Sequence, residues 1–94
     1  MDIEKDLENM LIREVKKLGG RCEKWGVNGW PDRMVFMPGN HTFFVELKRE
    51  KGVLSPLQKA QHLKLIKLGY DVFVPYTKDD VKAIIRKLIR VYGI

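Results

Sequence analysis

Hydrophobic and polar residues follow a helical period in some stretches of the chain and a strand period in others, which predicts the order of its elements. Between residues 2 and 18, apolar side chains recur every three or four positions, as in an amphipathic helix, and Gly19 and Gly20 end it. Strand-forming residues follow at 21–27, 32–37 and 41–48. The sequence "PGN" at 38–40 predicts a hairpin turn between the second and third of these strands.

The second half of the chain predicts two more helices around one short strand. Ser55 is a typical N-cap residue and Pro56 suits the first helical position, so we expect a helix from there to Gly69. Residues 70–75 form a short apolar run that is typical of a strand. Thr77 and Asp80 resemble a capping box ahead of a last helix with an apolar stripe. The predicted order is therefore α-β-β-β-α-β-α.

These elements predict an α/β fold in which helices flank a mixed β-sheet. The helix that joins the third and fourth strands would make that pair parallel, whereas the hairpin before it is antiparallel. The length suits one domain over residues 1–94. No apolar run approaches the roughly 20 residues that span a bilayer, and "MDIEKDLENM" is too acidic for a signal peptide. We therefore expect an intracellular, cytoplasmic protein.

The charge of the chain points to a polyanionic partner. The formal net charge is +6 and the pI is about 9.6, and nucleic acid is the simplest partner for such a protein. Lysines and arginines are interleaved with acids, so folding must assemble any basic surface. The single cysteine, Cys22, excludes an internal disulfide and a cysteine-based zinc site.

Acidic residues at the ends of two predicted strands are the strongest sign of chemistry. Glu46 and Lys48 share one face of the third strand with Phe44, where charge is costly unless it is paired or bound to metal. The hairpin can bring Asp32, at the start of the second strand, close to Glu46. Two such carboxylates repel each other unless a cation lies between them, and Mg²⁺ or Mn²⁺ prefers oxygen ligands. Lys48 could then orient the attacking water or help to deprotonate it, and offset phosphate charge.

The motifs around these residues resemble a known nuclease family. "GWPD" at 29–32 followed by "ELK" at 46–48 is similar to the PD-(D/E)xK superfamily. With "ENMLIREVKKLGG" before them and "LSPLQKAQHLKLIKLGYDVFV" after them, the chain resembles a VRR-NUC domain of the small stand-alone kind common in phages, over roughly residues 4–76. The resemblance implies a restriction-endonuclease-like fold, metal-dependent DNA cleavage and a phage or bacterial host. Trp30 departs from the smaller residue usual before the proline of this motif.

The resemblance also implies roles for individual residues. Asp32 and Glu46 would bind the metal, the backbone carbonyl of Leu47 would be a further ligand, and Lys48 would be the catalytic lysine. The family's acid on the first helix, which would be catalytic and bind metal, matches Glu8 best, with Glu4 one turn earlier as the alternative. The family's active-site glutamine matches Gln58, and Gln61 is the lesser candidate.

Basic residues near these motifs are the expected nucleic-acid contacts. They are Lys24, Arg33, Arg49, Lys51 and Lys59. No recognition helix or zinc-finger spacing occurs, so we expect specificity to depend on DNA shape. Trp25 and Trp30 could stack on unpaired bases, anchor the loop or contact a second copy. We expect His41 to be an exposed loop residue and His62 to pack at the flank of its helix.

Together these observations predict a structure-selective DNA endonuclease that depends on Mg²⁺ or Mn²⁺. Branched DNA, such as Holliday junctions or flaps, is the substrate class that the resemblance implies. A homodimer would supply two active sites, with the apolar side of the first or the last helix as its interface. The alternatives are a non-catalytic nucleic-acid-binding module and an accessory subunit of a replication or packaging complex.

Overall fold

The computed structural model describes residues 3–49 and 51–93, and its elements follow the predicted order. They are α1 (Glu4–Lys17), β1 (Arg21–Lys24), β2 (Arg33–Met37), β3 (His41–Val45), α2 (Pro56–Lys67), β4 (Asp71–Phe73) and α3 (Lys78–Tyr92). Position 2, where the pattern places the start of the first helix, lies outside the described residues. Within them, no helix is long and apolar enough to cross a membrane.

The four strands form one mixed sheet in the order β1-β2-β3-β4. β1, β2 and β3 pair antiparallel, and β4 adds to β3 in parallel after the α2 crossover. The register of the hairpin sets Arg33 opposite Val45, so the residues just beyond this pair, Asp32 and Glu46, leave the sheet at the same end. The predicted mixed sheet is confirmed, and its topology places the candidate acids together.

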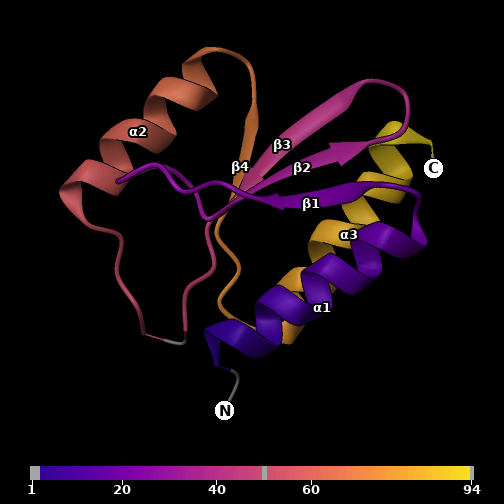
Figure 1. Ribbon diagram of the computed structural model, residues 1–94, viewed down its shortest axis with the longest axis horizontal. Helices are drawn as coiled ribbons and strands as arrows, with labels where there is room; N and C mark the ends of the chain where they lie inside the picture. The colour runs from indigo at the N-terminus through magenta and orange to yellow at the C-terminus, as the bar shows by residue number, and fades with distance from the viewer. Residues whose placement is uncertain (1–2, 50, 94) are drawn as a thin grey trace.

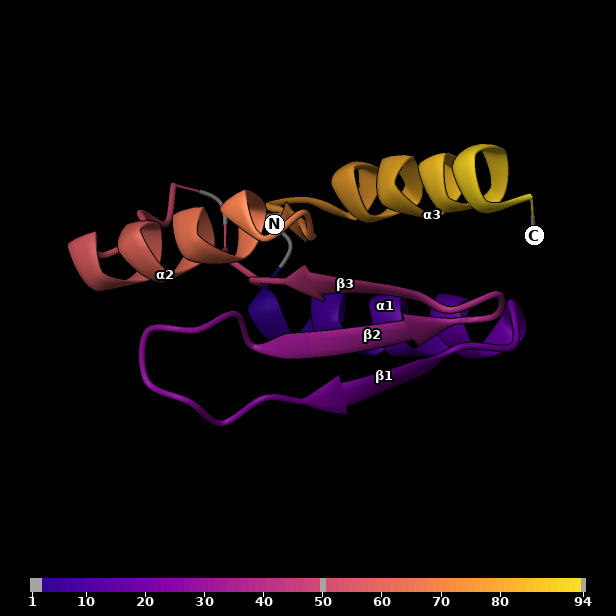
Figure 2. The same cartoon turned by 90° about the horizontal axis from the view of Figure 1, so that it is seen from above.

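Helices α1 and α3 lie side by side against one face of the sheet, and α2 stands apart from them near the end of β4 (Figures 1 and 2). Alternate residues of β2 and β3, among them Val35, Phe43 and Val45, point into the core that these two helices cover. The apolar stripes of α1 and α3 meet there as well. Most of both stripes is buried within the chain, and marginal residues such as Ile3 and Ile89 stay exposed, which argues against the expected dimer interface on either stripe.

Helix α2 begins as predicted but buries little of its apolar surface. The Ser55 hydroxyl accepts from the Gln58 backbone N–H, and the Gln58 side chain accepts from the Ser55 backbone N–H, which completes a capping box. Of its apolar side chains, Leu65 is buried. The exposed ones, with those of the chain just beyond the helix, are Leu57, Leu63, Ile66, Leu68 and Tyr70. Several of the exposed apolar side chains of the described residues are therefore grouped on and just after this helix.

All four strands are shorter than the sequence pattern predicts. β2 begins at Arg33 rather than at position 32, and β4 covers Asp71–Phe73 rather than 70–75. β1 ends at Lys24 rather than at position 27, because after Trp25 the chain turns away into an exposed loop. β3 ends at Val45 rather than at position 48, because β2 no longer runs beside it there. Its backbone continues to bond β4 and the chain after it, with the N–H of Glu46 donating to Phe73 and that of Lys48 to Pro75.

Candidate active site

Asp32 is held in place from two sides at the end of the hairpin. Its backbone carbonyl accepts from the N–H of Trp25 at 2.8 Å, which closes the loop between β1 and β2. Its side-chain Oδ2 accepts from the N–H of Leu47 at 2.9 Å. The carboxylate therefore takes the place that a backbone carbonyl of β2 would occupy if the sheet continued, and its position depends on the strand register.

Glu46 is a buried acid, and one of its carboxylate oxygens has no hydrogen-bond partner among the described residues. Its residue is 2% exposed, and that oxygen is Oε1. Burial, followed by a hydrogen bond to Asp32 and the negative charge of that residue, raises the pKa of Glu46 to about 8. Two carboxylates thus lie close together in a setting that disfavours their joint ionisation, which a cation would relieve.

Lys48 lies close enough to act on this pair electrostatically. Its positive charge opposes the rise in the pKa of Glu46, after the larger effects of burial and of Asp32. The Lys48 residue is half-buried, and its backbone is fixed by the bond to Pro75. The structure therefore brings together the three side chains that the motif analysis singled out.

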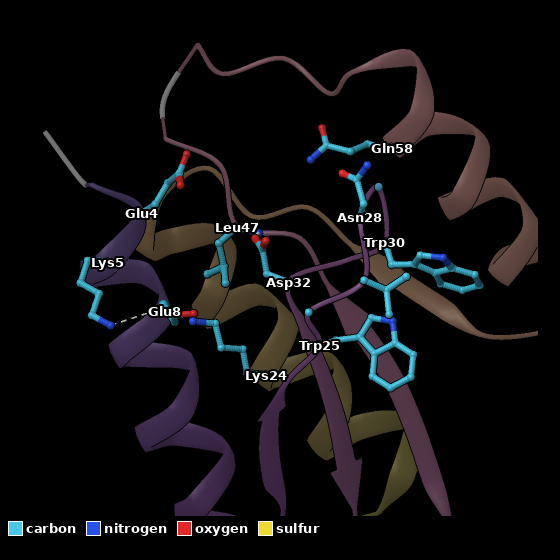
Figure 3. Close-up of a pocket in the computed structure, with 13 residues that line it drawn as sticks. Glu4, Lys5, Glu8, Lys24, Trp25, Asn28, Trp30, Asp32, Leu47 and Gln58 are labelled. Carbon is cyan, nitrogen blue, oxygen red and sulfur yellow. Dashed lines mark hydrogen bonds and ion pairs between the residues drawn. The ribbon is translucent and has the colours of Figure 1, made fainter.

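An open cleft of about 700 Å³ lies beside Asp32, between α1, the loop after β1 and the start of α2 (Figure 3). Asp32 and Leu47 form part of its wall together with Glu4, Lys5, Glu8, Lys24, Trp25, Gly26, Val27, Asn28, Gly29, Trp30 and Gln58. Glu46 and Lys48 are not among the lining residues, so the buried acid lies behind the wall that Asp32 forms. A phosphodiester could reach Asp32 from this cleft.

The two candidate acids of α1 have different surroundings. Burial alone would raise the pKa of Glu8, but a hydrogen bond and the charge of Arg33, and then those of Lys5, lower it. The Glu8 oxygens lie 3.0 Å from Arg33 Nε and 3.3 Å from Lys5 Nζ. Glu4 accepts from the backbone N–H of Arg49, and its charge contributes to the raised pKa of Glu46. Glu4 is therefore the α1 acid with a visible electrostatic effect on the buried pair.

The two candidate glutamines also have different surroundings. Gln58 lines the cleft, where its amide lies beside that of Asn28, a residue for which the sequence analysis proposed no role (Figure 3). Its Oε1 is engaged by the Ser55 backbone, which leaves the amide nitrogen for a ligand. Gln61 is absent from the cleft wall, and its Oε1 is buried without a hydrogen-bond partner among the described residues.

Four of the five basic residues expected to contact nucleic acid are exposed, namely Lys24, Arg49, Lys51 and Lys59. Lys24 also lines the cleft. Arg33 lies elsewhere: its side chain is 13% exposed, Nε donates to Glu8, and Nη1 donates to the carbonyl of Cys22. Arg33 is expected to contact nucleic acid, whereas in the structure its guanidinium bonds the Glu8 carboxylate and the Cys22 carbonyl.

His62 is a residue that the sequence analysis placed correctly at the flank of its helix without seeing its neighbour. Its ring is buried, and Nε2 lies 3.5 Å from Glu46 Oε1. The available signal was spacing, since Gln58 and His62 are four residues apart and share one face of α2. The expectation that His41 is an exposed loop residue is wrong. It is the half-buried first residue of β3, and its imidazole stacks on Tyr92 with ring centroids 3.9 Å apart.

The donor atoms at the site fit a hard divalent cation. They are carboxylate oxygens, one of them on a buried acid without a hydrogen-bond partner, and no thiolate lies among them. Within residues 3–49 and 51–93, no three His, Cys, Asp or Glu side chains converge as a ready-made metal cage. Mg²⁺ and Mn²⁺ tolerate such a site because they retain several waters when one or two carboxylates hold them.

Comparison with known proteins finds similarity to a phage nuclease and to a solved nuclease domain. No protein-family model matches the sequence. The protein named "Putative nuclease p44" from Acyrthosiphon pisum secondary endosymbiont phage 1 is 37% identical over 79 residues, which are 81% of this chain and 85% of that protein. A solved structure described as a VRR_NUC domain matches with a TM-score of 0.80 and 31% identity, over 95% of this chain and 96% of that one. The predicted fold is confirmed.

Proposed function

Because this chain belongs to the VRR-NUC family of nucleases, we propose that it is a divalent-metal-dependent endonuclease that hydrolyses the phosphodiester bonds of branched DNA. The observation that carries the metal dependence is the close pair of Asp32 and the buried Glu46. A protein that only binds DNA gains nothing from two converging acids, which repel phosphate. A protein that binds a cation between them recovers the cost of burying the charge.

The residues of the site have distinct proposed roles. Asp32 and Glu46 hold Mg²⁺ or Mn²⁺ through carboxylate oxygens, and the Leu47 carbonyl is a further ligand. When bound, an ion of this kind polarises a phosphoryl oxygen and lowers the pKa of a water molecule. Lys48 orients the attacking water and offsets the charge of the phosphate. Gln58 donates from its amide nitrogen, because its oxygen is already occupied.

The structure favours Glu4 over Glu8 as the acid of α1 that supports the ion. The charge of Glu4 reaches Glu46, whereas Glu8 is neutralised by Arg33 and Lys5. We therefore propose that Glu4 faces the ion, directly or through water, and that Glu8 fixes the end of α1 against β2.

The proposed DNA contacts are the exposed basic residues Lys24, which lines the cleft, and Arg49, Lys51 and Lys59. Contacts of this kind bind phosphates without reading bases, so affinity should fall steeply with salt. Selectivity for branched DNA would then come from how a distorted backbone fits the cleft, since a regular duplex presents its phosphates differently.

We propose that a second copy of the chain covers the exposed apolar surface of α2. A four-way junction is cut symmetrically only if two sites act on it, and one copy contains a single Asp32–Glu46 pair. The apolar faces of α1 and α3 are used inside the protein, whereas Leu63 and Ile66 are each 51% exposed on α2. The edge of β4 adjoins this surface, so two copies related by a twofold axis would present the same patch to each other.

The test of this function is cleavage of labelled four-way junction, flap, single-stranded and linear duplex DNA of matched sequence. We expect cleavage of branched substrates with Mn²⁺ or Mg²⁺ and none with EDTA. The Asp32→Asn, Glu46→Gln and Lys48→Met proteins should each lose on the order of 10³-fold in rate, which corresponds to about 4 kcal/mol. Lys82→Met, at an exposed position of α3, is the matched control for the lysine change.

Binding measured separately distinguishes the alternatives. The three variants should still bind the junction in gel-shift assays, because the basic surface is intact. If the wild-type protein binds junctions but cuts no substrate with Mn²⁺, it is a non-catalytic binding module and the proposed activity is wrong. Equal cutting of linear duplex and junction would refute the substrate preference alone.

A further inference from the structure

Two polar side chains are buried among residues 3–49 and 51–93, and they face each other. Glu46 is 2% exposed and His62 is 5% exposed. The distance from His62 Nε2 to Glu46 Oε1 is 3.5 Å, and among the described residues neither atom has a hydrogen-bond partner. Leaving such a group unsatisfied costs about 1–3 kcal/mol, so a buried pair that faces each other calls for an explanation.

We propose that His62 is a positioning residue, which donates a hydrogen bond from Nε2 to Oε1 of Glu46 and turns the other carboxylate oxygen toward the metal site. This inference rests on the proposed metal-dependent function. A small rotation of either side chain would shorten the distance to the usual range of about 2.7–3.2 Å. His62 would then act through Glu46 without touching the substrate.

The surroundings of His62 suit a neutral donor. His62 is 5% exposed and borders an apolar groove with Leu63 and Val72, a setting in which a charged ring is costly. A neutral imidazole carries one N–H, and it adds no positive charge that would compete with a cation for Glu46. Residues that hydrogen-bond to a metal ligand without touching the metal set the direction in which that ligand points.

The helix that carries His62 is fixed at the end nearest the site. The capping box of Ser55 and Gln58 closes the first turn of α2, and Gln58 itself lines the cleft one turn before His62. The same helix therefore positions both Gln58, which lines the cleft, and His62, which faces the buried Glu46. A movement of α2 would shift both at once.

A packing role is the competing explanation. His62 also lines an apolar groove between α2 and β4, together with Leu63 and Val72. If the imidazole only fills space there, an apolar side chain of similar size should serve as well and would remove an unsatisfied polar atom.

The test compares two nearly isosteric replacements, His62→Gln and His62→Met, of which only glutamine can donate a hydrogen bond. Mn²⁺ binding is measured by titration calorimetry, and folding by circular dichroism. We expect His62→Met to stay folded and to bind Mn²⁺ about 10- to 100-fold more weakly than wild type, the usual cost of losing an outer partner. His62→Gln should recover most of that affinity. His41→Gln, at the histidine that stacks on Tyr92, is the control and should bind as wild type does.

Each result decides the inference. Wild-type affinity in His62→Met, or equal weakness in the Met and Gln proteins, would show that His62 only packs. If wild type itself binds no Mn²⁺, the proposed function fails and this inference fails with it. If His62→Met does not fold, the pair His62→Asn and His62→Leu makes the same comparison, because the two side chains match in size and only asparagine can donate.

Discussion

Replacing Glu46 by glutamine should stabilise the protein when no metal is present. The folded protein raises the pKa of Glu46 from an ordinary value near 4.5 to about 8, through burial first and then through Asp32. The folded state therefore binds more protons than the unfolded state between these two values, and stability falls as the pH rises through this range. Glutamine carries no charge, so the Glu46→Gln protein does not lose stability through ionisation at this position.

The size of the effect follows from the shift. One pKa unit corresponds to about 1.4 kcal/mol, so an ionised Glu46 destabilises the metal-free protein at pH 8.5 by up to about 5 kcal/mol. The cost of leaving a buried polar group unsatisfied, about 1–3 kcal/mol, is a safer lower limit. For a domain of this size, 1 kcal/mol shifts the melting temperature by about 4–8 °C, so Glu46→Gln should melt at least about 4 °C higher at pH 8.5. At pH 5 the gap should shrink to under about 1 kcal/mol.

The assay is thermal melting in EDTA at both pH values, with Glu23→Gln as the control. The side chain of Glu23, on β1, is 46% exposed and pairs with Arg21 at the surface, so its replacement makes the same change in charge without touching the site. Adding Mn²⁺ at 100 times its dissociation constant should raise the free energy of unfolding of the wild-type protein by about 2.7 kcal/mol. The stability of Glu46→Gln should stay nearly unchanged. Equal melting of wild type and Glu46→Gln at pH 8.5, or a gap that does not depend on pH, would refute the reasoning.

Three further predictions follow from neighbouring contacts. Glu4→Gln should weaken Mn²⁺ binding roughly tenfold in calorimetry. Glu8→Gln should lower the free energy of unfolding in urea by about 1–2 kcal/mol and have little effect on Mn²⁺ binding. The reverse pattern would exchange the roles of the two acids. Gly29→Ala should cost about 1–3 kcal/mol in the same measurement, because φ is +81° and the new Cβ would lie 2.5 Å from Leu57 Cγ; an unchanged midpoint would contradict this. Ile66→Glu should convert a dimer into an 11.0 kDa species in light scattering, and a wild-type monomer at micromolar concentration would remove the dimer proposal.

The sequence predicted the fold well where local signals agree with tertiary packing. The capping residues Ser55 and Thr77 mark the starts of two helices, and both capping boxes are present in the structure. The "PGN" turn fixes the register of β2 and β3, because Asn40 adopts the left-handed conformation that such a turn requires. Strand ends were less predictable, since the end of β3 depends on where a neighbouring strand turns away.

The candidate site was predictable to the extent that it depends on strand register. Asp32 and Glu46 come together because their strands pair, which motif and topology both indicate. Side-chain contacts between elements that are distant in sequence could not be predicted, because no motif marks them. Arg33 looks like any other basic residue until the fold sets it beside Glu8, and His62 looks like a core histidine until Glu46 lies opposite it.

The backbone N–H of Leu47 donates a hydrogen bond to the Asp32 side chain, so this side chain has a structural role as well as its proposed catalytic one. Both roles restrict which residues can occupy position 32. A change there that removes the oxygen acceptor loosens the hairpin, and a change that removes only the negative charge leaves the hairpin intact. Asp32→Ala and Asp32→Asn would thus both inactivate the protein, the first through architecture as well as chemistry and the second through chemistry alone. Within residues 3–49 and 51–93, the side chain of Lys48 makes no hydrogen bond that holds the hairpin, so over evolutionary time position 32 should tolerate fewer replacements than position 48.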